Sequence, residues 1–211
     1  MPDPAPASGA ERPARPVVGM LLAAGAGRRM GRPKALVSDP ESGVPWLHQG
    51  VRTLLSGGCD EVVVVLGAEA HRALALLAEL GPAPVTSVTA ADWADGLSAS
   101  LRTGLDAAER MRAAAALVTL VDLPGLTAAS VARVLATAQR PATALAQATY
   151  DGRPGHPVLI GSDHVGALKA TLHGDRGARP YLRTHAALAI DCTDLGGGDD
   201  VDTFHPASGN S

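Results

Sequence analysis

The stretch that decides the fold is VVGMLLAAGAGRRMGRPKALV, residues Val17 to Val37. Its first seven residues, Val17–Ala23, form an uninterrupted apolar run, which is typical of a parallel strand buried on both faces. Glycines and cations follow this run directly. Glycine permits positive φ angles and a close approach of the backbone, so that several N–H groups can surround a phosphate, and cations neutralise its charge. The residues that predict a phosphate-binding loop are Gly25, Gly27, Gly31, Arg28, Arg29, Arg32 and Lys34.

The spacing of these glycines differs from two common phosphate-binding motifs. Met30 stands where G-x-G-x-x-G requires its third glycine, and the G-K-[ST] ending of a P-loop is missing. On the glycines alone, an ordinary strand-to-helix turn with solvated arginines explains the stretch equally well. Lys34 favours the phosphate interpretation, because it is one of only two lysines in the chain and lies among the glycines.

The rest of the chain alternates apolar strands with helices rich in alanine and leucine. This order predicts an α/β domain with a mostly parallel sheet covered on both faces, and a Gly/Pro turn near Tyr150 predicts a small antiparallel insertion. The expected strands are 17–23, 61–67, 84–90, one within 113–127, two within 142–161, and 187–191. The expected helices are 45–58, 69–81, 98–111, 128–139, 163–173 and 176–185.

Composition limits the classes of function. Apolar residues make up 46% of the 211, but aromatic residues only 2%, so the core is aliphatic and few rings are left to stack on single-stranded nucleic acid. A net charge of −3 gives no basic surface for duplex binding. The two cysteines, Cys59 and Cys192, are too few for a disulfide framework or a zinc site. We therefore expect a cytoplasmic protein with no nucleic-acid or membrane partner.

Composition along the chain predicts the domain organisation. Residues 1–16 are rich in proline, alanine and charge and lack the apolar segment of a signal peptide, which predicts a disordered leader. Residues 17–206 are expected to form a single domain, with a flexible tail at 207–211.

Ligands of such sheets bind beyond the carboxyl ends of the strands, which selects the loops after Ala23, Leu66 and Val121. Asp122 comes directly after an apolar strand, where a carboxylate could hold Mg²⁺. Alternatively, Asp122 is a turn or N-cap carboxylate, because Pro124 nearby also signals a turn.

The glycine loop and several later segments resemble those of a known family. LLAAGAGRRMGRPKAL is similar to the L-A-A-G-x-S-x-R-M-G-x-x-K signature of the MobA/MocA-like nucleotidyltransferases, although Ala26-Gly27 stand where the group often has x-Ser. Its A-A-G and K-x-L are closer to the molybdopterin cytidylyltransferase branch than to the guanylyltransferase branch, which typically reads A-G-G with Asp before Lys. Further segments resemble the family in the same order: ADWADGLSASLRTGL, LVTLVDLPGLT, DGRPGHPVLIG, LHGDRGARPYL and DDVDT.

The resemblance implies a Rossmann-like three-layer α/β/α sandwich that uses Mg²⁺ to move a nucleoside monophosphate from an NTP, in this branch CTP, to a phosphorylated acceptor such as molybdopterin. A molybdoenzyme or its chaperone would then receive the product. The implied catalytic residues are Lys34, Arg29 and Asp122, and the implied metal ligands are Asp122 and Asp202, with Asp199 and Asp200 as acidic neighbours that leave the register open. The implied nucleotide-binding residues are Ala23, Ala24, Gly25, Ala26, Gly27, Arg28, Gly67 and Ser100. On the acceptor side they are His156, Asp175 and Arg179.

The three acceptor-side residues, and Trp93 in the ADWADG segment, also have plainer interpretations. His156 between Gly155 and Pro157 could be a turn histidine, Asp175 and Arg179 could be a helix cap and a solvated charge, and Trp93 beside the base pocket could be a core residue.

Three other functions remain open. The first is a GTP-using or sugar-phosphate nucleotidyltransferase of the same fold. The second is an NAD(P)-type oxidoreductase, since some proteins with this signature are described as such. Against it, the acidic ribose-binding residue expected after the second strand is missing, because this strand ends in Leu66-Gly67. The third is an accessory protein that binds a cofactor without catalysis, which the presence of Lys34 and Asp122 disfavours.

Overall fold

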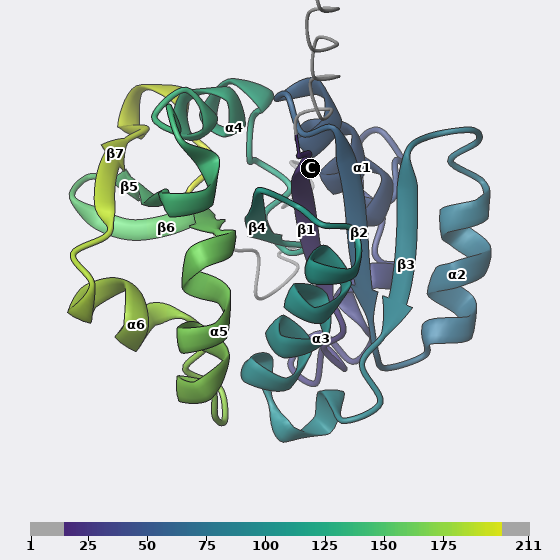
Figure 1. Ribbon diagram of the computed structural model, residues 1–211. Coiled ribbons are helices and arrows are strands. Elements are labelled where there is room, and N and C mark those ends of the chain that lie inside the picture. The colour runs from purple at the N-terminus through teal and green to yellow at the C-terminus, as the bar shows by residue number, and fades with distance from the viewer. Residues whose placement is uncertain (1–14, 200–211) are drawn as a thin grey trace, which may run out of the picture.

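The computed structural model describes residues 15–199, which build one sheet between two layers of helices (Figure 1). The strands are β1 (Val17–Ala23), β2 (Glu61–Leu66), β3 (Val85–Thr89), β4 (Ala115–Leu120), β5 (Leu145–Tyr150), β6 (Arg153–Gly161) and β7 (Leu188–Asp191). The α-helices are α1 (Trp46–Ser56), α2 (Ala70–Ala78), α3 (Leu97–Arg110), α4 (Ala128–Leu135), α5 (Ser162–Thr171) and α6 (Arg179–Thr184). Short 3₁₀ helices are η1 (Lys34–Leu36), η2 (Trp93–Asp95), η3 (Pro141–Thr143) and η4 (Thr193–Leu195). Within this described part of the chain, the helices are too short or too polar to cross a membrane.

The sheet has seven strands in the order β3-β2-β1-β4-β6-β5-β7. All neighbouring strands run parallel except at β6, which is antiparallel to both β4 and β5. β5 and β6 join through a tight turn around Gly152, whose φ is +72°. The expected α/β sandwich with a mostly parallel sheet and an antiparallel insertion is therefore confirmed.

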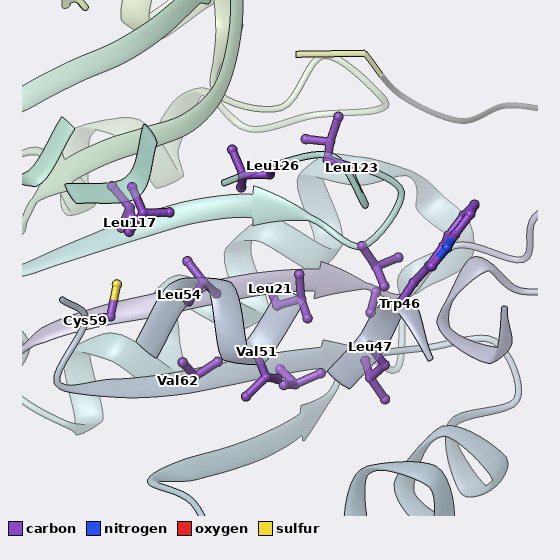
Figure 2. Packing of buried hydrophobic residues seen from close by; sticks show 14 of the residues in the cluster. Leu21, Trp46, Leu47, Val51, Leu54, Cys59, Val62, Leu117, Leu123 and Leu126 are labelled. Atoms are coloured by element: carbon purple, nitrogen blue, oxygen red, sulfur yellow. The ribbon is translucent and has the colours of Figure 1, made fainter. Parts of the chain in front are cut away.

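The apolar run of β1 fills both faces of the sheet, as a central strand must. Leu21 and Ala23 pack in a core with α1 and α4, whereas Met20 and Leu22 pack in a second core with α3 and α5. Figure 2 shows the first of these cores, with Leu21 among side chains of α1 and β4. Figure 1 shows α3 in front of β1 and β2. The alternation follows from the two-residue period of a strand.

The parallel strands bring three loops to one edge of the sheet. Ala23 pairs with Leu66 of β2, and Leu22 pairs with Leu120 of β4, so the three strands end at the same level. Two backbone bonds continue this pairing into the loops: Ala68 N–H donates to the carbonyl of Ala24, and Val121 N–H donates to the carbonyl of Leu22. This register fixes where the candidate site lies.

Two local features differ from the expected pattern. The expected helix 176–185 begins only at Arg179, because Gly174 and Gly177 have φ angles of +57° and +54°, which no α-helix accommodates. Lys34 begins a 3₁₀ turn instead of lying in an open loop.

The ends of the chain lie largely outside the described residues, so the domain boundaries stay a prediction. Of the expected leader only Arg15 and Pro16 are described. The Arg15 guanidinium donates to the carbonyls of Arg112 and Ala113, and the Pro16 carbonyl accepts from Ala114 N–H.

Two glycines give a matched test of the packing. A Cβ at Gly57, after α1, would lie 2.2 Å from Cγ1 and 2.4 Å from Cβ of Val131 in α4, whereas a Cβ at Gly166 within α5 would meet nothing within 4 Å. We expect Gly57→Ala to lower the free energy of unfolding by about 1–3 kcal/mol through overpacking. Gly166→Ala should raise it by about 0.5–1 kcal/mol through the better helix propensity of alanine. Denaturant unfolding measures both, and equal effects of the two variants would contradict this packing.

Candidate active site

An ion pair joins the loops after β1 and β4. Lys34 Nζ donates to Asp122 Oδ2 at 2.7 Å, across 88 residues of sequence. Both side chains are largely buried, with exposed fractions of 15% and 18%. Asp122 lies two residues beyond β4, and Lys34 is the first residue of η1. The fold therefore brings Lys34 and Asp122, the two strongest candidates from the sequence, into direct contact.

The glycine loop turns sharply before it reaches Lys34. Gly27 has a φ of +60°, and a Cβ there would lie 1.8 Å from the carbonyl oxygen of Arg32. Met30 N–H closes the turn by donating to the carbonyl of Gly27. Only glycine fits this position, because both the left-handed φ and the contact exclude a side chain. The turn folds the chain back so that η1 lies over the loop after β4.

A cavity of about 520 Å³, here called the first cavity, lies between these loops and the start of α3. Its lining includes most residues that the sequence assigned to catalysis and nucleotide binding: Ala23, Ala24, Gly25, Ala26, Gly27, Arg28, Arg29, Lys34, Ser100 and Asp122. Trp93 also lines it and at the same time packs against the core beneath α3, so both interpretations of this residue hold.

Gly67 is placed differently from the other members of that set. It does not line the first cavity. A Cβ at Gly67 would lie 2.6 Å from the carbonyl oxygen of Ala24 and 2.7 Å from Cβ of Trp93. Gly67 thus lets the loop after β2 pack closely under the cavity wall.

The expected acceptor-side residues gather around a neighbouring cavity of about 360 Å³, here called the second cavity. His156, Asp175 and Arg179 all line it. The two cavities are contiguous, since four residues line both: Leu22, Leu97, Leu120 and Asp175.

Asp175 holds the boundary between the cavities in place. Its Oδ1 accepts from the backbone N–H of Leu97, the first residue of α3, at 3.2 Å. The Gly174 carbonyl accepts from Ser98 N–H at 3.0 Å, and Gly96 before them has a φ of +108°. The cap interpretation of Asp175 is thus partly correct, but the helix it caps is α3, 78 residues earlier.

His156 enters the second cavity from β6 and is partly buried. Its Nδ1 lies 3.2 Å from the carbonyl oxygen of Val118. Because a carbonyl only accepts, Nδ1 carries the proton, and in the neutral ring Nε2 is an acceptor. Burial lowers the pKa of His156 below its usual 6.5, although the Val118 carbonyl and the charge of Asp122 act in the opposite direction. The Tyr150 hydroxyl donates to the His156 carbonyl at 2.9 Å and fixes the backbone.

The residues of the first cavity fit a hard divalent cation in one respect. Asp122 supplies a carboxylate at the cavity wall, and Mg²⁺ in nucleotide sites usually takes one or two carboxylates together with substrate phosphates and water. Within residues 15–199, no three histidine, cysteine, aspartate or glutamate side chains cluster to hold a metal by themselves. Asp202, the second expected ligand, lies outside the described residues. The described chain before it does pass the Asp122 loop, because a Cβ at Gly197 would lie 2.1 Å from the carbonyl oxygen of Gly125.

One supporting residue escaped the sequence analysis. Gln49 of α1 donates from Nε2 to the carbonyl of Pro124 at 2.8 Å and so anchors the loop that carries Asp122. Nothing in the local sequence marks Gln49, since it lies on an amphipathic helix 75 residues from its partner.

A glycine loop, a lysine and a strand-end carboxylate surround one cavity, an arrangement typical of α/β proteins that bind phosphates. Residues 19–189 match the family described as MobA-like NTP transferase domain. The chain therefore belongs to the MobA-like family of nucleotidyltransferases, as the resemblance implied.

Relatives within this family carry different names. The chain is 42% identical over 197 residues to a nicotine blue oxidoreductase of Paenarthrobacter nicotinovorans, covering 89% of this chain and 92% of that protein. It is 41% identical over 112 residues to a probable molybdenum cofactor guanylyltransferase of Rhodopirellula baltica, covering 53% of this chain and 50% of that one. Among solved structures, it is similar to Rv0371c of Mycobacterium tuberculosis, with 28% identity, a TM-score of 0.71, and coverage of 90% of this chain and 94% of that one. A manganese complex of Rv0371c is also similar, with 26% identity, a TM-score of 0.64, and coverage of 83% and 86%.

The environment of His156 predicts a pH dependence of stability. Because its pKa is lowered in the folded state, the unfolded chain takes up a proton first as the pH falls below about 6.5, and the free energy of unfolding decreases from there toward the folded pKa. His156→Asn retains a donor for the Val118 carbonyl but cannot titrate. We expect a shallower loss of stability between about pH 6.5 and 5 in this variant, measured by urea unfolding. His71→Asn, at an exposed position on α2, is the control. If the free energy of unfolding of His156→Asn changed with pH as steeply as that of the wild type, His156 would not be the group responsible.

Proposed function

We propose that this protein transfers a nucleoside monophosphate from an NTP, preferentially CTP, to a phosphorylated acceptor of the molybdopterin class, with release of pyrophosphate. The Lys34–Asp122 pair carries this proposal, because it places a cation and a carboxylate in the first cavity, directly beside the second. The two contiguous cavities give a donor and an acceptor separate places that meet at shared residues.

The reaction needs positioning and charge neutralisation more than covalent chemistry. An oxygen of the acceptor phosphate forms a bond to the α-phosphorus of the NTP, and the bond from that phosphorus to the β-phosphate oxygen breaks. No general base is required, because the attacking oxygen is already anionic.

The first-cavity residues divide this work. The backbone of the glycine loop and Arg29 would hold the β- and γ-phosphates. Lys34 would stabilise the negative charge that develops on the α-phosphate. Asp122, with Asp202 as a second proposed ligand, would hold Mg²⁺, which supplies neutralising positive charge when bound. His156, with Nε2 as an acceptor, would contact a donor group of the acceptor molecule in the second cavity.

The choice of nucleotide rests on the form of the glycine loop. Its A-A-G and K-x-L favour CTP, whereas the name of the Rhodopirellula baltica relative favours GTP. Incubation with each NTP, Mg²⁺ and molybdopterin, followed by pyrophosphate release, tests the proposal. We expect release with CTP above GTP and UTP, and no release with any NTP would refute the transferase function.

A second candidate is an oxidoreductase, which the name of the Paenarthrobacter nicotinovorans relative favours. The loop after β2 disfavours a dinucleotide of the Rossmann type, which needs a carboxylate there for the ribose. Gly67 packs under Trp93 instead, and Glu69 is exposed and pairs with Arg72. Thermal unfolding separates the two candidates: CTP–Mg²⁺ should raise the melting temperature and NADPH should not, whereas the opposite result would favour the oxidoreductase.

Removal of either member of the central pair should abolish most of the activity. We expect Lys34→Ala and Asp122→Ala to lower turnover about 10²-fold or more, the scale of losing one electrostatic stabiliser, with the fold retained. Lys169→Ala is the matched control, because the only other lysine pairs with Asp106 and Glu109 on the outer surface of α3 and α5. Steady-state pyrophosphate release measures turnover. Near-normal turnover of Lys34→Ala would exclude its proposed role.

A further inference from the structure

An irregularity in the pairing of β5 with β6 lies at the second cavity. The register shifts between Gln147 and Thr149, where β6 contributes three residues, 155–157, against one residue of β5. Irregular pairing of this kind re-aims side chains and is frequent beside binding sites. Gln147 of β5 and His156 of β6 flank the shift, and both line the second cavity.

Each of these two side chains is oriented by a backbone carbonyl. Nε2 of Gln147 donates to the carbonyl of Gly155 at 3.1 Å, and Nδ1 of His156 lies 3.2 Å from the carbonyl oxygen of Val118. Because a carbonyl only accepts, these contacts fix which way the amide points and which tautomer the ring adopts. Gln147 Oε1 and His156 Nε2 are left as acceptors, and neither has a hydrogen-bond partner within residues 15–199.

The wall around these two acceptors is mostly aliphatic. Leucine, valine and isoleucine side chains of β1, β4, β6, α3 and α6 form it. The charged residues of the lining, Asp175, Arg176 and Arg179, are exposed, whereas Gln147 and His156 are partly buried. An apolar cavity with a few fixed polar groups is typical of sites for small organic molecules. A ligand that enters this cavity therefore meets apolar walls and two acceptors that need donors.

Gln147 lies at the end of the second cavity that is farther from the Lys34–Asp122 pair. A third cavity of about 430 Å³ continues there toward β7, and Gln147 lines both the second and the third. His156 lines only the second of these two. The first and third cavities share no lining residue, so the three form a row with the second in the middle. A molecule that extends from Lys34 through the second cavity therefore reaches Gln147 with its far end.

We propose that the second cavity binds a flat heterocycle through two neighbouring N–H donors on one edge, and that Gln147 is a specificity residue for this ring. The inference rests on the proposed function, because it identifies the part of the acceptor that lies beyond the first cavity. A ring N–H beside an exocyclic amino group presents two such donors, and the pterin ring of the proposed acceptor class carries this edge.

The order of the cavities assigns the two donors. With the phosphate of the acceptor beside Lys34, the exocyclic amino group is at the far end of the molecule and would donate to Gln147 Oε1. The neighbouring ring N–H would donate to His156 Nε2. Burial lowers the pKa of His156, so its ring stays neutral near pH 7 and Nε2 remains an acceptor.

The first experiment needs no enzymatic reaction. Fluorescence titration of the full-length protein compares pterin with lumazine, which has a carbonyl oxygen where pterin has its amino group, at a pH at which both rings are neutral. We expect the wild type to bind pterin about tenfold more tightly, because the lumazine oxygen would face the Gln147 acceptor. Gln147→Met has a similar length but no acceptor oxygen. It should weaken pterin binding about tenfold and leave lumazine binding unchanged.

The chain offers a matched control for this variant. Gln139 is exposed and lines none of the three cavities, so Gln139→Met should change the affinity for neither ring. Three outcomes would overturn the proposal: equal affinity of the wild type for the two rings or binding of neither, a preference for pterin that persists in Gln147→Met, or an equal loss for both rings, which would indicate a damaged cavity.

The second experiment is pyrophosphate release with CTP and molybdopterin. There Gln147→Met should raise the KM for the acceptor about tenfold and leave the KM for CTP unchanged, and an unchanged acceptor KM would contradict the role of Gln147. If the wild-type protein releases no pyrophosphate with any NTP, the proposed function fails, while the titration still decides whether the second cavity binds the ring.

Discussion

The Lys34–Asp122 ion pair is the interaction on which the candidate site depends. It closes the glycine loop over the end of β4 and keeps two opposite charges largely buried within 2.7 Å of each other. A largely buried ion pair is costly to break by removing one partner, because the other charge is left uncompensated. A bound nucleotide with its metal, as we propose, would replace both partners at once, because a phosphate would pair with the ammonium and the metal ion with the carboxylate. Under the proposed function, the pair would keep the first cavity organised without a ligand and would be exchanged for substrate contacts when a nucleotide binds.

Hydrogen bonds between segments distant in sequence hold the loops around this pair in place. Gln49 anchors the Asp122 loop through the Pro124 carbonyl, and Asp175 anchors the boundary between the cavities through Leu97 N–H. β6 runs against its neighbours and so brings His156 to the second cavity beside the strands that carry Asp122. The antiparallel insertion thus contributes to the second cavity, where we propose that the acceptor binds, while the parallel half of the sheet contributes to the first, where we propose that the nucleotide binds. One relative of this chain is named as a transferase and another as an oxidoreductase. A protein that binds a dinucleotide in the Rossmann manner would need a different residue in the loop after β2.

The sequence predicts much of this organisation, for identifiable physical reasons. Strand β1 matches its expected range residue for residue, because a continuous apolar run before glycines has one interpretation. Asp122 is recognisable because it follows a strand whose carboxyl end lies at the ligand-binding edge of the sheet, and Lys34 because it is one of only two lysines and lies among the glycines after β1. The contacts of Gln49 and Asp175 were not, since a hydrogen bond across 75 or 78 residues leaves no periodic signal. The late start of α6 was missed because glycines with positive φ resemble helix-compatible residues until the backbone is known. The continuity of the three cavities depends on packing that no local pattern encodes.

The most direct test of the central claim is the affinity of Asp122→Asn for CTP, measured by calorimetry with and without Mg²⁺. In the absence of divalent metal, the wild-type carboxylate competes with the triphosphate for Lys34 and repels it. Asp122→Asn should therefore bind CTP about tenfold more tightly than wild type in EDTA, a difference of about 1.4 kcal/mol, and should gain little from added Mg²⁺. Equal CTP affinity of the two proteins in EDTA, with the same gain on addition of Mg²⁺, would contradict the account.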